Sequence, residues 1–339
     1  MAPSVVYSVG KGGVGKTTCA AALALHTSHT CRTLVVSLDP AHNLGDVLEH
    51  PLGEKPKEVS SGLWASEVDM EGAVDRYLKA SSEKLRQMYG YLKVINMEGY
   101  LDALRLSPGI EEYATLQAME ELLSTAEGRF DIVVFDTPPT GLTLRVLALP
   151  QVSLLWGERL ARLRREILHK RGAIKNIHGE RKFVLEGKEE ILAADEKSDA
   201  VMRELRDYST RMQRMTALQA DAVHSRVMPV MNADRLSLFE TKRALQSLSR
   251  LGMCIGPVIV NKVGVKSTDE QTVEEIEREL ERPVRKLPFM AIEPVGFEAL
   301  QRIEAQLSFE QWVPETPAQT FGGENEQRLP SRPQRRKDA

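Results

Sequence analysis

The chain has 339 residues, a formal net charge of −3 and 27% charged residues, a balance that gives no reason to expect nucleic acid as the main partner. Hydrophobic residues make up 42% of the chain, which is ample for a sizeable core. The cysteines Cys19, Cys31 and Cys254 lack CxxC spacing, which argues against a disulfide framework or a structural zinc site.

No stretch reaches the roughly 18 consecutive apolar residues that a membrane helix needs. The N-terminus also lacks the charged and apolar regions of a signal peptide. We therefore expect a cytoplasmic protein without a transmembrane segment of its own. Any membrane role would run transiently through a partner.

Short valine-rich runs alternate with helical patterns along the chain. The runs are apolar throughout, which predicts strands covered on both faces, as in a mostly parallel sheet flanked by helices. Helices between them imply right-handed βαβ crossovers and an α/β fold. The predicted strands are residues 4–9, 33–38, 63–68, 131–136, 226–231, 256–261 and 285–289.

A glycine-rich loop, GKGGVGKT, follows the first predicted strand and opens a predicted helix, which is the context of a P-loop. Its glycines let backbone N–H groups turn toward phosphate oxygens, and the helix N-terminus adds partial positive charge. Lys16 can reach the β- and γ-phosphates of ATP, and the Thr17 hydroxyl can bind Mg²⁺. The predicted nucleotide-binding residues of this loop are Gly10, Lys11, Gly12, Gly13, Val14, Gly15, Lys16, Thr17 and Thr18.

Lys11 is a second lysine in this short loop. Because Lys16 already serves the bound nucleotide, Lys11 can point away from it. Across a two-fold axis it could meet the phosphates of a partner subunit, like an arginine finger supplied in trans. A solvated surface lysine is the alternative.

Two aspartates each end a predicted strand at the sheet edge where the P-loop lies. Asp39 could orient the attacking water and touch the Mg²⁺ shell, or it could simply cap a helix. Asp136 follows four apolar residues, which is the Walker B pattern and places a carboxylate beside hydrated Mg²⁺. Residues 137–141, TPPTG, could register the γ-phosphate and relay its loss.

Two long stretches, 70–128 and 150–225, read as mostly helical and predict an inserted α-helical subdomain for a client or partner. The second stretch predicts one long helix from Ile191 to Leu218. The other predicted units are a P-loop ATPase domain over 1–69, 129–149 and 226–313, and a disordered tail over 314–339.

Residues 170–187 break the helical pattern and predict a mobile loop. Residues 159–182 carry nine Lys or Arg against two Glu. A solvated surface explains this excess, and docking to an acidic membrane partner or to lipid head groups is the alternative.

The segments GKGGVGKTT, DPAHNLGD and DTPPTGLTLR together resemble the ArsA/Get family of deviant Walker A ATPases. Its members are the arsenite-pump ATPase and the ATPase that targets tail-anchored membrane proteins. Further segments match in order, so that the resemblance covers nearly residues 3–310. It implies an Mg²⁺-dependent homodimer that closes around two ATP molecules and opens after hydrolysis.

The resemblance also implies site residues. Lys11 would be the intersubunit lysine, Asp39 the water-activating residue of the first switch, and Asp136 part of the second switch. Catalysis would rest on Asp39, Lys11 and Lys16, and the metal site on Thr17, Asp39 and Asp136. The other implied nucleotide contacts are Asn43 across the dimer, Asn261 at the adenine, and Pro288 and Met290 in the loop that packs the base.

The cargo stays open at this point. Arsenite needs several thiolates in one place, and residues 70–225 contain no cysteine. Cys31 and Cys254 could meet only if the strands that follow them are neighbours. The first hypothesis is arsenite efflux with a membrane pump, and the alternative is delivery of tail-anchored proteins to an insertase. For the alternative, Met202, Met212 and Met215 could line an apolar groove or simply pack a helix onto its neighbours.

Overall fold

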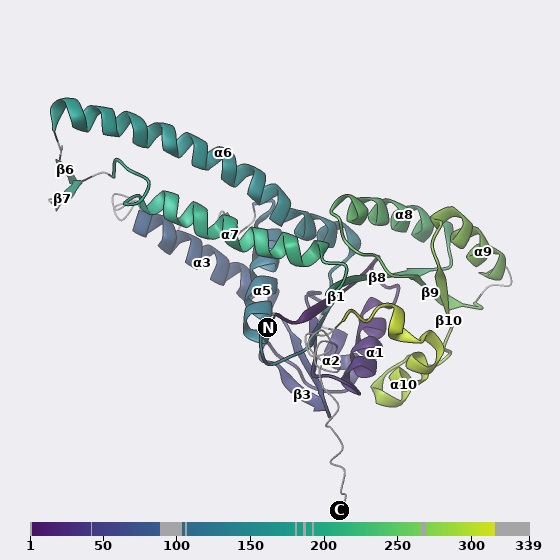
Figure 1. The fold of residues 1–339 in the computed structure, drawn as a ribbon. Helices are drawn as coiled ribbons and strands as arrows, with labels where there is room; N and C mark the ends of the chain where they lie inside the picture. Colours follow the sequence, from purple (N-terminus) through teal and green to yellow (C-terminus); the bar gives the residue numbers. More distant parts are fainter. Residues whose placement is uncertain are drawn as a thin grey trace, which may run out of the picture.

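A computed structural model gives the fold, and all structural statements below refer to its described residues. The described ranges are 2–41, 43–88, 104–105, 107–179, 182–185, 188–191, 193–265 and 269–315. Their centre is an eight-stranded sheet with helices on both faces, from one side of which long helices project as an arm (Figure 1).

The strands lie in the order β10-β9-β8-β1-β5-β2-β4-β3, and neighbouring pairs are parallel except β3 with β4. All seven predicted strands are confirmed. The sequence pattern missed β3 because this short edge strand is polar and partly exposed. The bounds are β1 Ser4–Gly10, β2 Thr33–Ser37, β3 Lys57–Ser60, β4 Leu63–Glu67, β5 Ile132–Asp136, β8 Ser225–Asn232, β9 Val258–Val263 and β10 Val284–Pro288.

The central strands are buried on both faces, which explains why their sequences are apolar without alternation. Val6 and Val134 belong to the core that includes α1, whereas Tyr7 and Phe135 belong to the core on the opposite face. The Tyr7 and Phe135 rings stack with centroids 5.8 Å apart. The sheet edge that carries the carboxyl ends of β1, β2 and β5 is thereby held rigidly.

Helices cover each face of the sheet. Residues of α1, α2 and α10 belong to the core on one face of the sheet. Residues of α3, α5, α6 and α7 belong to the core on the opposite face. A third apolar cluster joins α8 and α9 to β8 and β9. The bounds are α1 Lys16–Ser28, α2 Asn43–Leu48, α3 Met70–Met88, α5 Ile110–Ala126, α6 Thr140–His178, α7 Ala200–Ala220, α8 Arg235–Arg250, α9 Asp269–Leu280 and α10 Gly296–Leu307.

The projecting arm consists of α3, α5, α6 and α7, with a small hairpin at its far end (Figure 1). Helix α6 is 39 residues long, begins four residues after β5 ends, and runs along α7. The hairpin pairs β6 (Lys182–Leu185) with β7 (Lys188–Ile191). No described helix is both long and apolar enough to cross a membrane.

Two boundary predictions in this arm are wrong. The loop predicted over 170–187 is instead the end of α6 and part of the hairpin, because α6 keeps packing as far as the buried Leu168 and continues to His178. The helix predicted from Ile191 begins at Ala200. There the Asp199 carboxylate accepts a hydrogen bond of 2.8 Å from Met202 N and caps the helix.

The last described residues lie against the sheet domain. The backbone N–H of Glu315 donates to the carbonyl of Val223 at 3.0 Å, and the Ser4 hydroxyl donates to the carbonyl of Glu315. Residues 316–339 lie outside the described residues, so the disorder predicted for the tail stays a prediction. The division of the chain into an ATPase domain and a helical subdomain also stays a prediction.

Candidate nucleotide site

The P-loop turns sharply between β1 and α1. Gly13 and Gly15 have φ angles of 77° and 92°, which favour glycine. A Cβ atom on Gly15 would lie 2.3 Å from Asn261 Nδ2, so the close approach of β9 also requires glycine there. Gly15 caps α1 without a side-chain hydrogen bond. The first-turn N–H groups of α1 are therefore suited to phosphate oxygens.

Two side chains from the end of β9 hold the loop, and both residues also line the cavity beside it. Asn261 Nδ2 donates to the carbonyl of Val14 at 2.8 Å, and Lys262 Nζ donates to the carbonyl of Gly13 at 2.9 Å. Asn261 Oδ1 accepts from the backbone N–H of Lys262 at 2.7 Å. In this arrangement Asn261 braces the P-loop, in addition to lining the cavity where its adenine contact is predicted.

A cavity of about 830 Å³ opens beside the loop, between α1, α2 and the segment after β10. It brings together most of the predicted nucleotide contacts: Gly13, Gly15, Lys16, Thr17, Thr18, Asp39, Asn43, Asn261, Pro288 and Met290. Its size suits a bound nucleotide. The other predicted residues do not line it: Gly10, Lys11, Gly12, Val14 and Asp136.

Asp136 lies behind the cavity wall, fully buried. Its Oδ2 accepts hydrogen bonds from Thr17 Oγ1 at 2.8 Å and from Ser37 Oγ at 3.3 Å. Within the described part of the chain its Oδ1 has no partner. A buried carboxylate oxygen without a donor is what a water of hydrated Mg²⁺ would satisfy, so these residues fit the metal.

Burial raises the pKa of Asp136 to about 6, against the opposing effects of the Thr17 hydrogen bond and the Lys16 charge. We expect the Mg²⁺-dependent part of ATP affinity to fall as pH drops below about 6, because a protonated Asp136 cannot accept from a metal-bound water. Calorimetry of ATP binding, with Mg²⁺ and with EDTA at pH values on both sides of about 6, measures the Mg²⁺-dependent part of the affinity. ATP itself titrates nearby, so Asp136→Asn is the control. If the Asp136→Asn variant had the same pH profile as wild type, the assignment of Asp136 to the Mg²⁺ site would be contradicted.

The same shift has a consequence for stability. Because the pKa of Asp136 is raised in the folded protein, its contribution to the free energy of unfolding is full below the unfolded value of 3.8 and is lost as pH rises through about 6. Above that pH the nucleotide-free protein holds a buried charge. Mg²⁺ at the site would offset that charge.

Asp39 follows β2 and lines the cavity. Its backbone N–H donates to Ser37 Oγ at 3.3 Å, and its Oδ1 accepts from the backbone N–H of Ala41 at 3.1 Å. The carboxylate therefore braces the first residues of its own loop without capping α2, which begins at Asn43. The structure therefore does not support the alternative that Asp39 caps a helix.

The two lysines of the loop are placed differently. Lys16 is buried, lines the cavity, and its Nζ donates to the carbonyl of Lys11 at 3.3 Å. Lys11 is half-buried and does not line the cavity of its own chain. This placement agrees with a role for the Lys11 side chain away from its own nucleotide.

Sequence reasoning missed several residues of the site. Ser37 links the two aspartates, Lys262 braces the loop, and Asp46 lines the cavity. Their positions at or next to the last residue of a strand, or one helical turn after Asn43, were the available signal. The sequence alone does not indicate the direction in which each of these side chains points.

The thiols are dispersed. Cys19 is buried in α1, where burial raises the pKa of its thiol, while Cys31 and Cys254 are half-buried. The strands after Cys31 and Cys254 are β2 and β9, which are separated in the sheet by β8, β1 and β5. Since strands lie about 4.8 Å apart, these two thiols cannot meet. The described residues contain no group of three or more His, Cys, Asp and Glu that could hold a metal ion.

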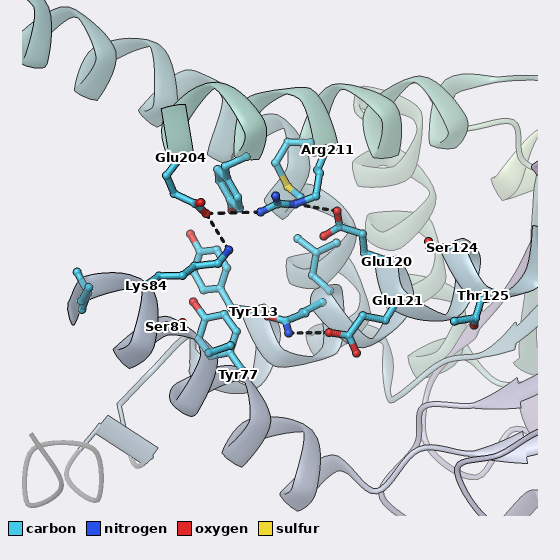
Figure 2. A pocket seen from close by; sticks show the side chains of 16 residues that line it. Tyr77, Ser81, Lys84, Tyr113, Glu120, Glu121, Ser124, Thr125, Glu204 and Arg211 are labelled. Atoms are coloured by element: carbon cyan, nitrogen blue, oxygen red, sulfur yellow. Dashed lines mark hydrogen bonds and ion pairs between the residues drawn. The ribbon is translucent and has the colours of Figure 1, made fainter. Parts of the chain in front are cut away.

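A second cavity, of about 700 Å³, lies in the arm between α3, α5 and α7 (Figure 2). Tyr77 and Tyr113 form one wall, with rings stacked 6.2 Å apart, and Leu116 and Met212 contribute apolar surface. No cysteine lines this cavity. It is therefore suited to apolar or aromatic groups and not to a thiophile.

Ion pairs frame this cavity and tie α7 to its neighbours (Figure 2). Lys84 on α3 lies 2.7 Å from Glu204 on α7, and Arg211 on α7 lies 3.0 Å from Glu120 on α5. Burial raises the pKa of Glu120 despite the Arg211 charge. These partly exposed pairs contribute little stability each, but they set the spacing of the helices around the cavity.

A mostly parallel sheet whose strand ends carry a P-loop, a buried aspartate bonded to the P-loop threonine and a second aspartate-bearing loop defines a P-loop ATPase of the α/β class. A model of the anion-transporting ATPase family matches residues 4–308, and the chain belongs to this family.

Curated relatives carry names from two branches of the family. One is a "Putative arsenical pump-driving ATPase" of Prosthecochloris vibrioformis, 32% identical over 88% of this chain and 73% of the relative. Another is an "ATPase GET3C" of Arabidopsis thaliana, 32% identical over 75% of this chain and 65% of the relative. A third is an "ATPase ASNA1 homolog 1" of Paramecium tetraurelia, 28% identical over 76% of this chain and 74% of the relative.

Proposed function

We propose that this ATPase hydrolyses ATP with Mg²⁺ as a cytoplasmic homodimer, and that closing and opening of the dimer energise a membrane-directed process through a pump or insertase partner. The observation that carries the proposal is Asp136, buried beside Thr17 with one oxygen free to hold a metal-bound water. When bound, Mg²⁺ would supply charge to the β- and γ-phosphate oxygens.

In this proposal the residues of the nucleotide site have separate roles. Asp39 orients the attacking water, and Lys16 offsets charge on the γ-phosphate. Lys11 reaches the phosphates of the partner subunit, and Asn43, which lines the cavity of its own chain, also contacts the nucleotide across the dimer. The adenine would rest between Asn261 and the segment from Pro288 to Met290.

The relay from nucleotide to arm would begin at Thr137, directly after Asp136. Its Oγ1 donates to the carbonyl of Ser8 at 2.6 Å and accepts from Thr143 Oγ1 at 3.0 Å. Thr143 lies in the first turn of α6, so a shift of residues 137–140 would move the start of the arm.

Lys16→Ala tests the loop assignment. The substitution removes a charge-assisted hydrogen bond to phosphate, so we expect ATP affinity to fall by about 10- to 100-fold. Lys242→Ala is the matched control, since this lysine on α8 pairs with Glu279 and does not line the cavity. Equilibrium binding of a fluorescent ATP analogue measures both variants. Unchanged affinity in Lys16→Ala would refute the assignment.

For the cargo, the cavity in the arm favours an apolar membrane segment, as in delivery of tail-anchored proteins. Its accessible surface comes mainly from apolar and aromatic groups such as Tyr77, Tyr113 and Leu116, ion pairs border it, and no thiolate lines it. Met202, Met212 and Met215 are all buried, which fits the packing alternative for all three residues.

Arsenite efflux is the second candidate, and the names of the arsenical pump-driving relatives favour it. Two measurements separate the candidates. Arsenite-stimulated turnover that is lost in a cysteine-free variant would support metalloid transport. Nucleotide-dependent co-purification with a hydrophobic C-terminal peptide, reduced by Leu85→Glu at the exposed border of the cavity, would support targeting.

A further inference from the structure

Lys262 has a backbone conformation that is unusual for its place in the fold. Its φ angle is 58°, in the left-handed region that residues other than glycine rarely adopt. The other such residues of the described chain, Glu49, Glu281 and Ser308, each directly follow the end of a helix, where this conformation is common. Lys262 lies inside β9 instead. Because this conformation costs free energy in a strand, it indicates a function for the side chain.

The pairing of β9 with β10 shifts at the same place. Two residues of β9 oppose a single residue of β10 between two pairs of the register, which are Val260 with Lys286 and Val263 with Pro288. Such a bulge changes the direction of side chains, which otherwise alternate between the two faces of a sheet. As a result the successive residues Asn261 and Lys262 both donate side-chain hydrogen bonds to the P-loop.

The side chain of Lys262 lies at the border of the nucleotide cavity. Its backbone belongs to the end of β9, and its ammonium group lies 2.9 Å from the carbonyl oxygen of Gly13. The methylene chain therefore spans the distance from the strand to the loop. Lys262 is exposed and lines the cavity. A methylene chain that is held at both ends presents apolar surface to a ligand.

The segment after β10 supplies apolar surface next to Lys262. The backbone N–H of Phe289 donates to the carbonyl of Val263 at 2.8 Å, which holds this segment against the end of β9. Pro288, Phe289 and Met290 line the same cavity as Lys262, and Phe289 is 51% exposed. A planar base that enters between Lys262 and this segment would meet apolar surface from both.

We propose that Lys262 is a base-positioning residue, whose methylene chain supports the face of the adenine ring while its ammonium group holds the P-loop. The inference rests on the proposed place of the base beside Asn261, and it adds a residue whose surface is open to the ring. The Asn261 amide already donates to the carbonyl of Val14 and accepts from the N–H of Lys262. A base that covers the Lys262 chain restricts its rotamers, so base binding would stabilise the loop that binds the phosphates.

Two substitutions separate the methylene chain from the ammonium group. Lys262→Met keeps an unbranched chain without the charge, and Lys262→Ala removes both. The two variants have equal charge and both lose the hydrogen bond to Gly13, so they differ only in the chain. Each should bind inorganic tripolyphosphate with Mg²⁺ about two- to fivefold more weakly than wild type, because the loop is no longer held.

The contribution of the base is measured by the base increment, which is the affinity for ATP divided by the affinity for tripolyphosphate, both with Mg²⁺. Lys262→Ala should lower the base increment about fivefold, because the ring loses the apolar contact with the chain. Lys262→Met should keep the base increment within about twofold of wild type. Competition against a fluorescent ATP analogue gives both affinities on the full chain, and thermal unfolding without ligand checks that each variant is folded.

Two further variants serve as references. Lys16→Ala removes a predicted phosphate contact and should weaken the binding of ATP and of tripolyphosphate alike. Lys242→Ala, on α8 and outside the cavity, should change neither. If Lys16→Ala bound both ligands as wild type does, the nucleotide site itself would be misplaced and the inference would fail with it.

The comparison of the two Lys262 variants decides the inference. A base increment that falls in Lys262→Ala and is kept in Lys262→Met supports the contact between chain and ring. A base increment that is unchanged in both variants would overturn it and leave Lys262 with the loop alone. A base increment that falls equally in both would overturn it as well, since the charge and not the chain would then act on the base.

Discussion

Replacement of Asp39 by asparagine should lower ATP turnover by about 10²- to 10⁴-fold while ATP still binds, because the lost carboxylate orients and deprotonates the attacking water. The variant keeps the size of the side chain and can still accept from the backbone N–H of Ala41. Binding by the P-loop should therefore be preserved. In the proposed cycle the dimer opens only after hydrolysis, so the nucleotide-closed dimer should accumulate.

Asp46→Asn is the matched control for this prediction. Asp46 is another carboxylate at the same cavity, on α2. Single-turnover hydrolysis with radiolabelled ATP would measure the chemical step, and sedimentation with ATP and Mg²⁺ would measure closure. Equal losses in both variants would assign the effect to the local field and not to Asp39. Wild-type turnover in Asp39→Asn would remove its catalytic role.

Lys11→Ala should lower turnover by about 10³-fold, at the low end of the range for cationic residues supplied in trans, and leave ATP affinity of the monomer nearly unchanged. The physical basis is the position of Lys11: its carbonyl contacts Lys16 Nζ, but its side chain does not line the cavity of its own chain. Binding and turnover measured on the same preparation separate the two effects. Lys11→Arg should retain part of the activity, because it keeps the charge.

Mixed dimers distinguish a role in trans from one in cis. In a dimer of one Lys11→Ala and one Asp39→Asn copy, the first copy keeps its own Asp39 and receives Lys11 from its partner. One of the two sites is then complete, so purified mixed dimers should show about half of wild-type turnover. If Lys11 acts on its own nucleotide, both sites lack one residue and activity stays at the level of the single variants.

Much of the nucleotide site could be predicted because its residues lie in a few short, contiguous segments of the chain. The P-loop needs glycine at fixed positions for steric reasons, and Asp39 and Asp136 follow apolar strands that parallel pairing brings to one edge. Asn261 could be placed in the site only through the family resemblance. Its hydrogen bond to Val14 O joins residues that lie far apart in the chain. Such contacts have no local signature.

The arm shows where sequence patterns fail. Glycine and lysine in residues 170–178 suggested a loop, yet α6 continues through them beyond the start of α7, where Arg171 contacts the segment that precedes α7. Periodicity suggested that α7 starts near Ile191, whereas the cap at Asp199 sets the start. Helix propensity is a weak influence, and tertiary packing and caps override it at element ends.

The sequence by itself determined the class of protein, the parallel sheet and the loop that binds phosphate, because steric rules for glycine and burial of apolar strands act locally. Only the tertiary structure decided which side chains share a cavity and that Cys31 and Cys254 lie apart. The reason is that these properties depend on strand order and helix packing, which join residues distant in the chain.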